Sequence, residues 1–339
     1  MRIPVDISNP AREAVAQAAE VIRTGGLVAF PTETVYGLGA NALDVAAVQR
    51  VFTAKGRPPH NPLIAHVADQ HGAADLVTVW PESAARLAEA FWPGPLTLVL
   101  PRSAIVPDLV TAGLPEVAVR VPAHPVALAL LRAAELPIVA PSANPAAAIS
   151  PTTADHVERN LGRAVDLILD AGPTRLGIES TVIDLSRDPP LLLRPGALPT
   201  KSIEAITGPL GRPGRGTTKE RHASPGMRAR HYAPRATLVV FRPDERAAAN
   251  AIARRAATNG QTVGALLLEP LNGLEASPDH QVIMPHDPQA YAHRLYAELH
   301  RLDDLGCDLI LAQQVPDRPG WEAVRDRLTR ASAPETDLD

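Results

Sequence analysis

Lys55 is one of only three lysines in a sequence that holds thirty arginines. It lies in the stretch TAKGRPPHNPLIAHV (53–67), beside Arg57, Asn61 and His66. Lysine supplies a compact charge for a phosphate, and arginine supplies a flat fork of donors. The intervening glycine removes side-chain bulk and three prolines limit the freedom of the loop, which lowers the ordering cost when an anion binds. We therefore expect this loop to bind the phosphates of a nucleotide, with a solvated basic turn as the alternative.

A second cation, Arg120, interrupts the apolar segment VAVRVP (117–122). It must either extend outward on a polar face or pair with an anion. Because strand residues alternate, Val119 and Val121 face away from Arg120, and a solvated edge position is the alternative. Arg194 ends the apolar run LLLRPG in the same way.

Small polar side chains follow several of the apolar segments. They are Thr32 and Thr34 in PTET, Ser142 and Asn144 in APSAN, and Ser180 and Thr181 in ESTVID. Hydroxyls at strand ends suit hydrogen bonds to a polar ligand, although any turn there also accepts them.

PTETVYGLGANA contains the pattern G-x-G-x-x-A, but it does not predict a dinucleotide site. Pro31 interrupts the preceding strand before the glycines, and no acidic residue follows about 20 positions later. We expect Gly37 and Gly39 to let the backbone bend sharply and to place the threonine hydroxyls at a strand end.

A nucleophile is not evident in the sequence. Cys307 lies in an apolar strand, the serines lack a G-x-S-x-G motif, and the histidines are not at metal-ligand spacing. The pattern favours an electrostatic clamp, as in nucleotidyl transfer, where positioning and charge neutralisation account for the rate.

Composition limits the classes of protein further. A chain of 339 residues with 45% hydrophobic residues can form two domains with separate cores. A single cysteine excludes an internal disulfide, and with no signal-peptide pattern or apolar run of membrane-span length it favours the cytoplasm. The net charge is −4 over residues 1–200, +6 over 201–235 and −6 over 236–339, so a basic signature of nucleic-acid binding is missing from both expected bodies.

Alternating helix and strand signals predict an α/β fold. Before the basic segment, helices are expected at 10–24, 44–55 and 81–92, among strands that include 26–30, 62–67, 96–101 and 180–185, which together form an open, twisted, mixed sheet. After it, strands at 236–241 and 262–268 surround a helix at 243–259 and predict a smaller Rossmann-like domain. The expected division is a domain at 1–206, a linker at 207–234 and a C-terminal accessory domain at 235–339.

The ordered motifs resemble the YrdC-like domain. They are PTETVYGLG, KGRPPHNPLIAHV, FWPGPLTLVL, VAVRVPAHP, APSANPAAAISPT, ESTVID and LRPGAL. The trailing SPGMRARHYAP and the second domain are similar to the two-domain L-threonylcarbamoyladenylate synthases, and the resemblance covers nearly the whole chain.

That resemblance implies a reaction. L-Threonine and bicarbonate give a carbamate, which attacks the α-phosphate of ATP to yield threonylcarbamoyl-adenylate, pyrophosphate and water. A separate transferase complex then modifies adenosine 37 of tRNAs that read ANN codons, and direct tRNA binding by this chain is expected to be weak. Mg²⁺ is expected with the ATP, and no metal site of the protein itself is expected.

Roles of individual residues follow from the resemblance. The threonine-binding positions are Thr34, His66, Arg120, Ala140 and Ser180, with Arg120 forked onto the carboxylate. The ATP-binding positions are Lys55, Arg57, Asn61, Ser142, Ser150, Arg194 and Tyr232, of which Tyr232 would reach back from a lid formed by the linker. Lys55, Arg57 and Arg120 are the expected catalytic residues.

Glu116 departs from the family pattern, because similar sequences often carry a small hydroxyl there that contacts ATP.

Two alternative functions remain. One is a carbamoyl-adenylate-forming carbamoyltransferase, whose extra domains do not fit in 339 residues. The other is an RNA-binding or translation-associated module, which the domain charges disfavour.

Overall fold

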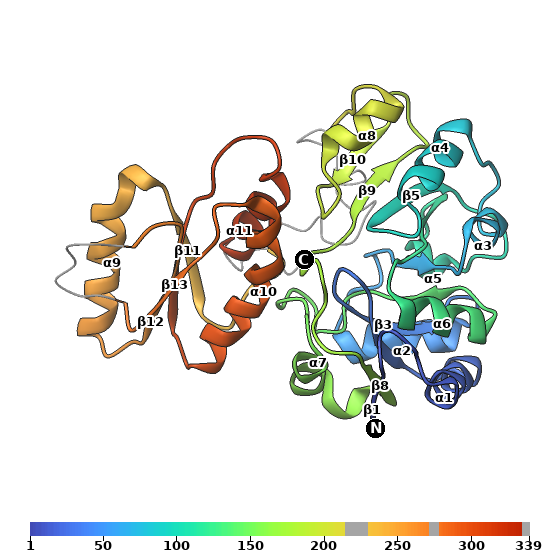
Figure 1. Cartoon of the computed structure of the whole chain (residues 1–339), viewed down its shortest axis with the longest axis horizontal. Coiled ribbons are helices and arrows are strands. Elements are labelled where there is room, and N and C mark those ends of the chain that lie inside the picture. The colour runs from blue at the N-terminus through green and yellow to red at the C-terminus, as the bar shows by residue number, and fades with distance from the viewer. Residues whose placement is uncertain (214–229, 271–277, 334–339) are drawn as a thin grey trace. The chain divides into compact units, whose positions relative to one another are not determined.

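The computed structural model describes residues 1–213, 230–270 and 278–333, in two compact units (Figure 1). The first unit comprises Met1–Ala146 and Ser150–Arg228, and the second comprises Ala147–Ile149 and Ala229–Asp339. Residues 214–229, which make up most of the predicted linker, lie outside the described residues. None of the described helices is long and apolar enough to cross a membrane.

A ten-stranded mixed sheet forms the centre of the first unit. In spatial order its strands are β1 (Arg2–Pro4), β8 (Leu167–Asp170), β2 (Val28–Pro31), β3 (Tyr36–Asn41), β7 (Ile138–Val139), β4 (Ile64–His66), β6 (Glu116–Arg120), β5 (Leu96–Pro101), β9 (Thr181–Asp184) and β10 (Leu191–Arg194). The pairs β4–β6 and β5–β9 are parallel, whereas β2–β3, β5–β6 and β9–β10 are antiparallel. This confirms the predicted mixed sheet.

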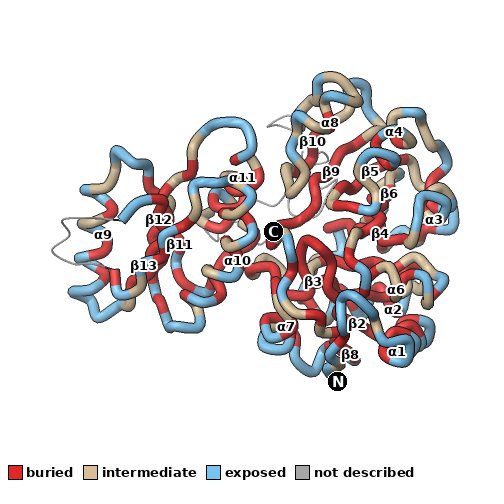
Figure 2. The backbone as a smooth tube through the Cα atoms, in the orientation of Figure 1, coloured by how far each residue is buried: buried red, intermediate tan, exposed pale blue. Residues whose placement is uncertain are grey.

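Helices cover both faces of this sheet, so its strands are buried on both sides (Figure 2). Along β2, Val28 and Phe30 belong to a core with helices α1 (Arg12–Arg23) and α6 (Pro125–Ala134). Ala29, pointing the other way, belongs to the larger core with α2 (Val45–Lys55), α4 (Glu82–Phe91), α7 (Ala154–Leu161) and α8 (Thr200–Thr207). Three shorter helices are α3 (Gln70–Asp75), α5 (Asp108–Thr111) and η1 (Gly162–Ala164).

Helix α2 shows how local sequence sets the position of a site residue. Asp44 caps its first turn by accepting from the backbone N–H groups of Ala46 and Ala47. Gly56 ends it in the left-handed conformation, with φ 58°, which glycine adopts without strain. Lys55 is therefore the last residue of the helix, which ends where the predicted helix at 44–55 ends.

The expected role of two glycines is wrong. Gly37 and Gly39 do not form a bend but lie inside β3, and the turn is made by residues 32–35. A Cβ on Gly39 would come within 2.8 Å of the Phe30 ring, and a Cβ on Gly37 within 3.1 Å of the Ala140 Cβ. These glycines allow close packing on the sheet rather than a change of direction.

A four-stranded parallel sheet forms the second unit, in the order β11 (Thr237–Phe241), β14 (Leu309–Gln313), β12 (Val263–Leu267) and β13 (His280–Ile283). Helix α9 (Arg246–Thr258), preceded by η3 (Pro243–Glu245), lies on one side of it, and α10 (Pro288–Asp304) and α11 (Glu322–Ala331) lie on the other (Figure 1). The predicted small α/β domain is confirmed.

Candidate active site

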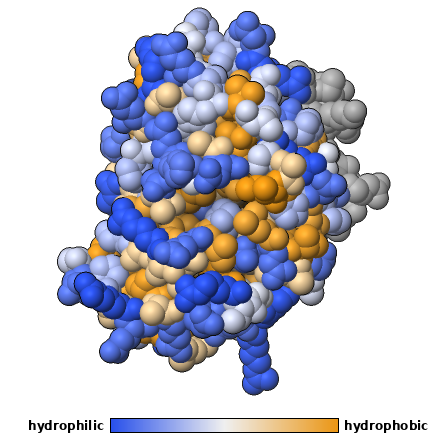
Figure 3. Space-filling view, turned by 90° about the vertical axis from the view of Figure 1, so that its right-hand side faces the viewer, coloured by the Kyte–Doolittle hydropathy of each residue, from blue (hydrophilic) through white to orange (hydrophobic). Residues whose placement is uncertain are grey.

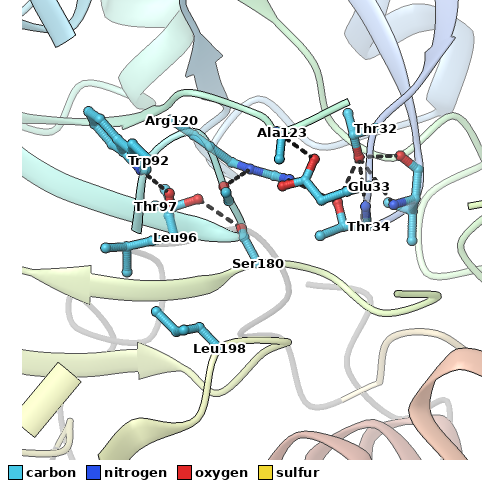
Figure 4. A network of polar contacts seen from close by, with 12 residues as sticks. Thr32, Glu33, Thr34, Trp92, Leu96, Thr97, Arg120, Ala123, Ser180 and Leu198 are labelled. Carbon is cyan, nitrogen blue, oxygen red and sulfur yellow. Dashed lines mark hydrogen bonds and ion pairs between the residues drawn. The ribbon is translucent and has the colours of Figure 1, made fainter. Parts of the chain in front are cut away.

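Arg120 is the centre of a buried polar network (Figure 4). It is the last residue of β6 and only 4% exposed, which excludes the solvated edge position. Its Nη2 donates to Glu33 Oε1 at 2.6 Å and to Thr34 Oγ1 at 3.2 Å, and its Nε donates to the carbonyl of Gly94 at 3.2 Å. The arginine therefore joins the turn between β2 and β3 to the turn that precedes β5.

Glu33 is a site residue that the sequence analysis missed. Its side chain is buried; Oε2 accepts the backbone N–H of Ala123 at 3.0 Å, and its own carbonyl accepts from Leu176 at 2.8 Å. The available signal was an acidic residue in PTET next to a strand that reads as fully buried, since buried carboxylates need a cationic partner.

The hydroxyls of the same turn are tied together. Thr32 Oγ1 lies 2.7 Å from Thr34 Oγ1 and donates to the carbonyl of Val35 at 2.7 Å. Both threonines are buried. The turn thus holds the Thr34 hydroxyl beside the guanidinium of Arg120.

His66 shares the register level of Arg120. The two residues pair across the parallel strands β4 and β6, so their side chains point to the same face of the sheet. Burial, and then the positive charge of Arg120, lower the pKa of His66 to about 3, so the imidazole is neutral. Its Nδ1 is buried and has no hydrogen-bond partner among the described residues.

Ser180 immediately precedes β9 and lies beside two further polar side chains. Its Oγ is 2.8 Å from Thr97 Oγ1 and accepts from Arg194 Nη2 at 3.1 Å, and its carbonyl accepts from the same Nη2 at 3.0 Å. Thr97, which is fully buried in β5, was not among the predicted residues because a threonine in an apolar strand carries no distinguishing pattern.

The loop within residues 53–67, for which phosphate binding is predicted, folds onto itself and onto the APSAN turn (140–144). Lys55 Nζ donates to the carbonyls of Ser142 and Asn144 at 2.5 Å each. Arg57 Nε donates to the carbonyl of Asn61 at 3.1 Å. Burial, and next the nearby Arg57, hold the pKa of Lys55 well below its usual range. The structure therefore brings Lys55, Arg57, Asn61 and Ser142 together.

Ala140 and Ser150 lie on either side of that turn. The backbone N–H of Ala140 donates to the carbonyl of Ile64, the first residue of β4, at 3.2 Å. Ser150, fully buried, donates to Glu179 Oε1 at 2.5 Å, one residue before Ser180. These contacts tie Ala140 to β4 and Ser150 to the residue that precedes Ser180.

Tyr232 belongs to the second unit. Its ring stacks on Tyr296 at a centroid distance of 5.8 Å, and the guanidinium of Arg327 lies 4.8 Å from its ring centroid. Tyr232 is 1% exposed. Its role over the nucleotide stays a prediction.

Glu116 occupies the other end of β6 from Arg120. At ~3.3 Å per strand residue the two are separated by about 13 Å along the strand. Burial, and then Asp184, raise the pKa of Glu116. It therefore does not join the Arg120 network.

Two features lie outside the network. Cys307 is buried, and burial raises the pKa of its thiol, so the predicted core position is confirmed.

A pocket of about 460 Å³ opens on the face that carries α3 and the end of α6, where apolar residues gather around a hollow (Figure 3). Val67 lines it, but none of the predicted site residues does.

Comparison with known proteins identifies the family. A family model described as "Telomere recombination", for the Sua5, YciO and YrdC proteins, matches residues 20–196, and the model of the threonylcarbamoyl-AMP synthase C-terminal domain matches residues 199–333. Threonylcarbamoyl-AMP synthase of Pyrococcus abyssi is 45% identical over 320 residues, 93% of each chain. The chain belongs to the threonylcarbamoyl-AMP synthase family.

Two further members support this assignment. The threonylcarbamoyl-AMP synthase of Bacillus subtilis is 43% identical, with 94% of this chain and 92% of the relative covered. The crystal structure of Pyrococcus abyssi Sua5 complexed with L-threonine superimposes with a TM-score of 0.89 at 43% identity, over 98% of this chain and 97% of that one. Membership of the threonylcarbamoyl-AMP synthase family thus extends over both units.

Proposed function

We propose that this enzyme is a nucleotidyltransferase that converts L-threonine, bicarbonate and ATP into threonylcarbamoyl-adenylate, pyrophosphate and water. The observation that carries the proposal is the likeness to threonylcarbamoyl-AMP synthases over both units, at 45% identity across 93% of the chain. The product serves as donor for threonylcarbamoyladenosine at position 37 of tRNAs that read ANN codons.

The Arg120 network supports the amino-acid half of this reaction. Nη1 of Arg120 makes no hydrogen bond to a described residue, so it is available to the threonine carboxylate. The neutral imidazole of His66 can accept a hydrogen bond from an N–H or O–H of the ligand. Thr34 and Ser180 supply hydroxyls beside it.

The chemistry needs no protein nucleophile. Bicarbonate takes up a proton and loses water to give CO₂. The amine of threonine forms a C–N bond to the carbon of CO₂ and loses a proton, giving a carbamate. A carbamate oxygen then forms a bond to the α-phosphorus of ATP while the bond to the pyrophosphate oxygen breaks. Positioning of two anionic reactants and neutralisation of their charge supply the rate, as in other phosphoryl and nucleotidyl transfers.

The polar residues around the APSAN turn support binding of ATP. Arg57 and Arg194 are buried guanidinium groups, and Lys55 holds the carbonyls of Ser142 and Asn144 in place. Groups of three or more metal-ligating side chains are missing from the described residues. We propose that Mg²⁺ enters with the triphosphate, whose oxygens are its preferred ligands.

The alternatives are not favoured. A carbamoyltransferase does not explain the match of residues 199–333 to the C-terminal domain of threonylcarbamoyl-AMP synthase. An RNA-binding module leaves the buried Arg120 network without a purpose. Transfer of the product to a tRNA-modifying complex remains part of the proposal.

Release of pyrophosphate tests the function. The purified chain is incubated with ATP, Mg²⁺ and bicarbonate, with L-threonine present or omitted and with L-serine as the control. We expect release that depends on threonine and bicarbonate. Release that is absent, or that is the same with and without threonine, would overturn the proposal.

A further inference from the structure

Both carboxylate oxygens of Glu33 are used by the protein itself. Oε1 accepts from Arg120 Nη2 at 2.6 Å, and Oε2 accepts from the backbone N–H of Ala123 at 3.0 Å. The residue is 2% exposed. A carboxylate so enclosed does not contact a substrate, so any effect on the reaction passes through its two partners (Figure 4). Of these, Arg120 is the side chain that still has donors for a ligand.

Glu33 leaves only part of the Arg120 guanidinium available to a ligand. A guanidinium has five N–H donors. The Nε donor binds the carbonyl of Gly94, and the two donors of Nη2 bind Glu33 and Thr34. Only Nη1 is without a hydrogen bond to the described residues. Nη1 is not among the buried side-chain atoms that lack a partner, so it is accessible, and an oxygen of a ligand can accept a hydrogen bond from it.

We propose that Glu33 is a positioning residue that holds Arg120 in one orientation and offers only Nη1 to the substrate carboxylate. This rests on the proposed function, since it takes threonine as the ligand of Arg120. The ion pair excludes the two-nitrogen fork that an arginine usually presents to a carboxylate. Glu33 also compensates the charge of Arg120, so that the guanidinium stays buried when no ligand is bound.

Two substitutions separate these roles. Glu33→Asp keeps the negative charge but is one methylene too short to reach both Arg120 and Ala123, so the guanidinium moves toward it and away from the ligand. Glu33→Gln keeps the length but has a single acceptor oxygen for two donors, and it leaves the charge of Arg120 uncompensated. That charge strengthens attraction to a carboxylate and partly offsets the lost orientation.

Calorimetric titration with L-threonine and with ATP provides the first test. We expect Glu33→Asp to weaken threonine binding about 10-fold or more, because small displacements of a positioning group have large effects. We expect Glu33→Gln to weaken it by less, about 3-fold, because of the Coulombic gain. ATP affinity should stay within about twofold in both variants, since the two carboxylate contacts do not involve the APSAN turn. Glu20→Gln, which removes a carboxylate from the surface pair with Arg23, is the matched control and should change neither affinity.

Thermal unfolding should rank the two Glu33 variants in the opposite order from threonine affinity. An uncompensated buried charge destabilises the fold, so Glu33→Gln should unfold at a lower temperature than Glu33→Asp. A residue that served only the stability of the fold would weaken threonine and ATP binding together, in the order of the melting temperatures. That result, or threonine affinities within twofold of the wild type in both variants, would overturn the proposal.

The Nε–H resonance of Arg120 tests positioning without any substrate. In protein labelled with ¹⁵N-arginine it is identified as the signal that Arg120→Lys removes. We expect this signal to shift or broaden in both Glu33 variants while the other arginine signals persist. An unchanged signal would overturn the positioning role. If the wild type bound no threonine, the proposed function would fail, whereas a changed Arg120 signal would still support the positioning role.

Discussion

At the scale of single residues, burial decides what Arg120 and His66 can do. An arginine on a surface strand contributes little beyond charge, because water screens it. Arg120 is instead enclosed and paired with a buried carboxylate, so the direction of its remaining Nη1 donors is set by that pair. The same enclosure keeps His66 neutral at physiological pH, with Arg120 adding to the effect.

The lowered pKa of His66 predicts a pH dependence of stability. Its pKa is about 3 in the folded chain against an ordinary value of 6.5. Between these values the unfolded chain binds a proton that the folded chain does not, so the free energy of unfolding rises with pH across this window. The maximum slope from this group is about 1.4 kcal/mol per pH unit, and below pH 3 its contribution no longer changes.

Denaturant unfolding of the wild type and of His66→Gln at pH 4.5, 5.5 and 6.5 measures that slope. We expect the wild type to lose stability more steeply as the pH falls, because glutamine binds no proton in the unfolded chain. Equal slopes in the two proteins would contradict the assignment of a neutral buried imidazole.

At the scale of elements, the turn after β10 is shaped by its contact with β9. The β9–β10 ladder shifts register between Leu192 and Arg194, an irregularity that re-aims a side chain. Beyond it, a Cβ on Gly196 would lie 2.3 Å from the carbonyl carbon of Ser180 and 2.4 Å from the nitrogen of Thr181. Only glycine lets the two backbones approach so closely.

Gly196→Ala should therefore separate the turn from β9 and weaken the bonds of Arg194 to Ser180. We expect a loss of about 1–3 kcal/mol in the free energy of unfolding, as for other overpacked sites, together with weaker ATP binding. Gly72→Ala in α3 is the control, because its Cβ would meet Val67 at an ordinary 3.4 Å. Chemical denaturation compares the two, and equal stability of the Gly196 variant and the wild type would show that the turn can shift freely.

At the scale of the whole molecule, the chain does not divide at a single point. Residues 147–149 come from the middle of the first unit's sequence but belong to the second unit. The N–H of Ala233 donates to the carbonyl of Ala147 at 2.8 Å, and Ala148 forms a parallel bridge with Ala233. Ser150, which binds Glu179, follows this segment directly.

Removal of residues 236–339 should therefore also impair the activity of the first unit. The truncated chain keeps Tyr232 but loses Tyr296 and Arg327, which bury its ring. We expect turnover to fall at least about tenfold, since a displaced positioning group has effects of this size, and we expect ATP binding to weaken more than threonine binding. The measurement is threonine-dependent pyrophosphate release, with folding of the first unit checked by circular dichroism. Unchanged kinetics would contradict this role of the second unit.

Periodicity and local chemistry were sufficient for much of the fold. The apolar stripes predict α1, α2, α4 and α9 to within three residues, because an amphipathic helix repeats its pattern locally. Helix α6 was not predicted from the sequence. Apolar residues such as Val126, Leu130 and Leu131 occur along its whole length, so a one-sided apolar stripe does not stand out. The family, both folded units and the buried arginine in β6 were likewise accessible from motifs.

Partnership between distant residues was decided only by the tertiary structure. Arg120 and Glu33 are 87 positions apart, and Thr97 and Ser180 are 83 apart. Each residue's type and local pattern could be read from the sequence, including the need of a buried arginine for an anion. Which anion it meets depends on the order in which ten strands assemble, and a one-dimensional pattern of apolar and polar residues does not encode that order. The ion pair of Glu33 with Arg120 is thus a product of sheet topology, and the need for such a pair is a property of the sequence.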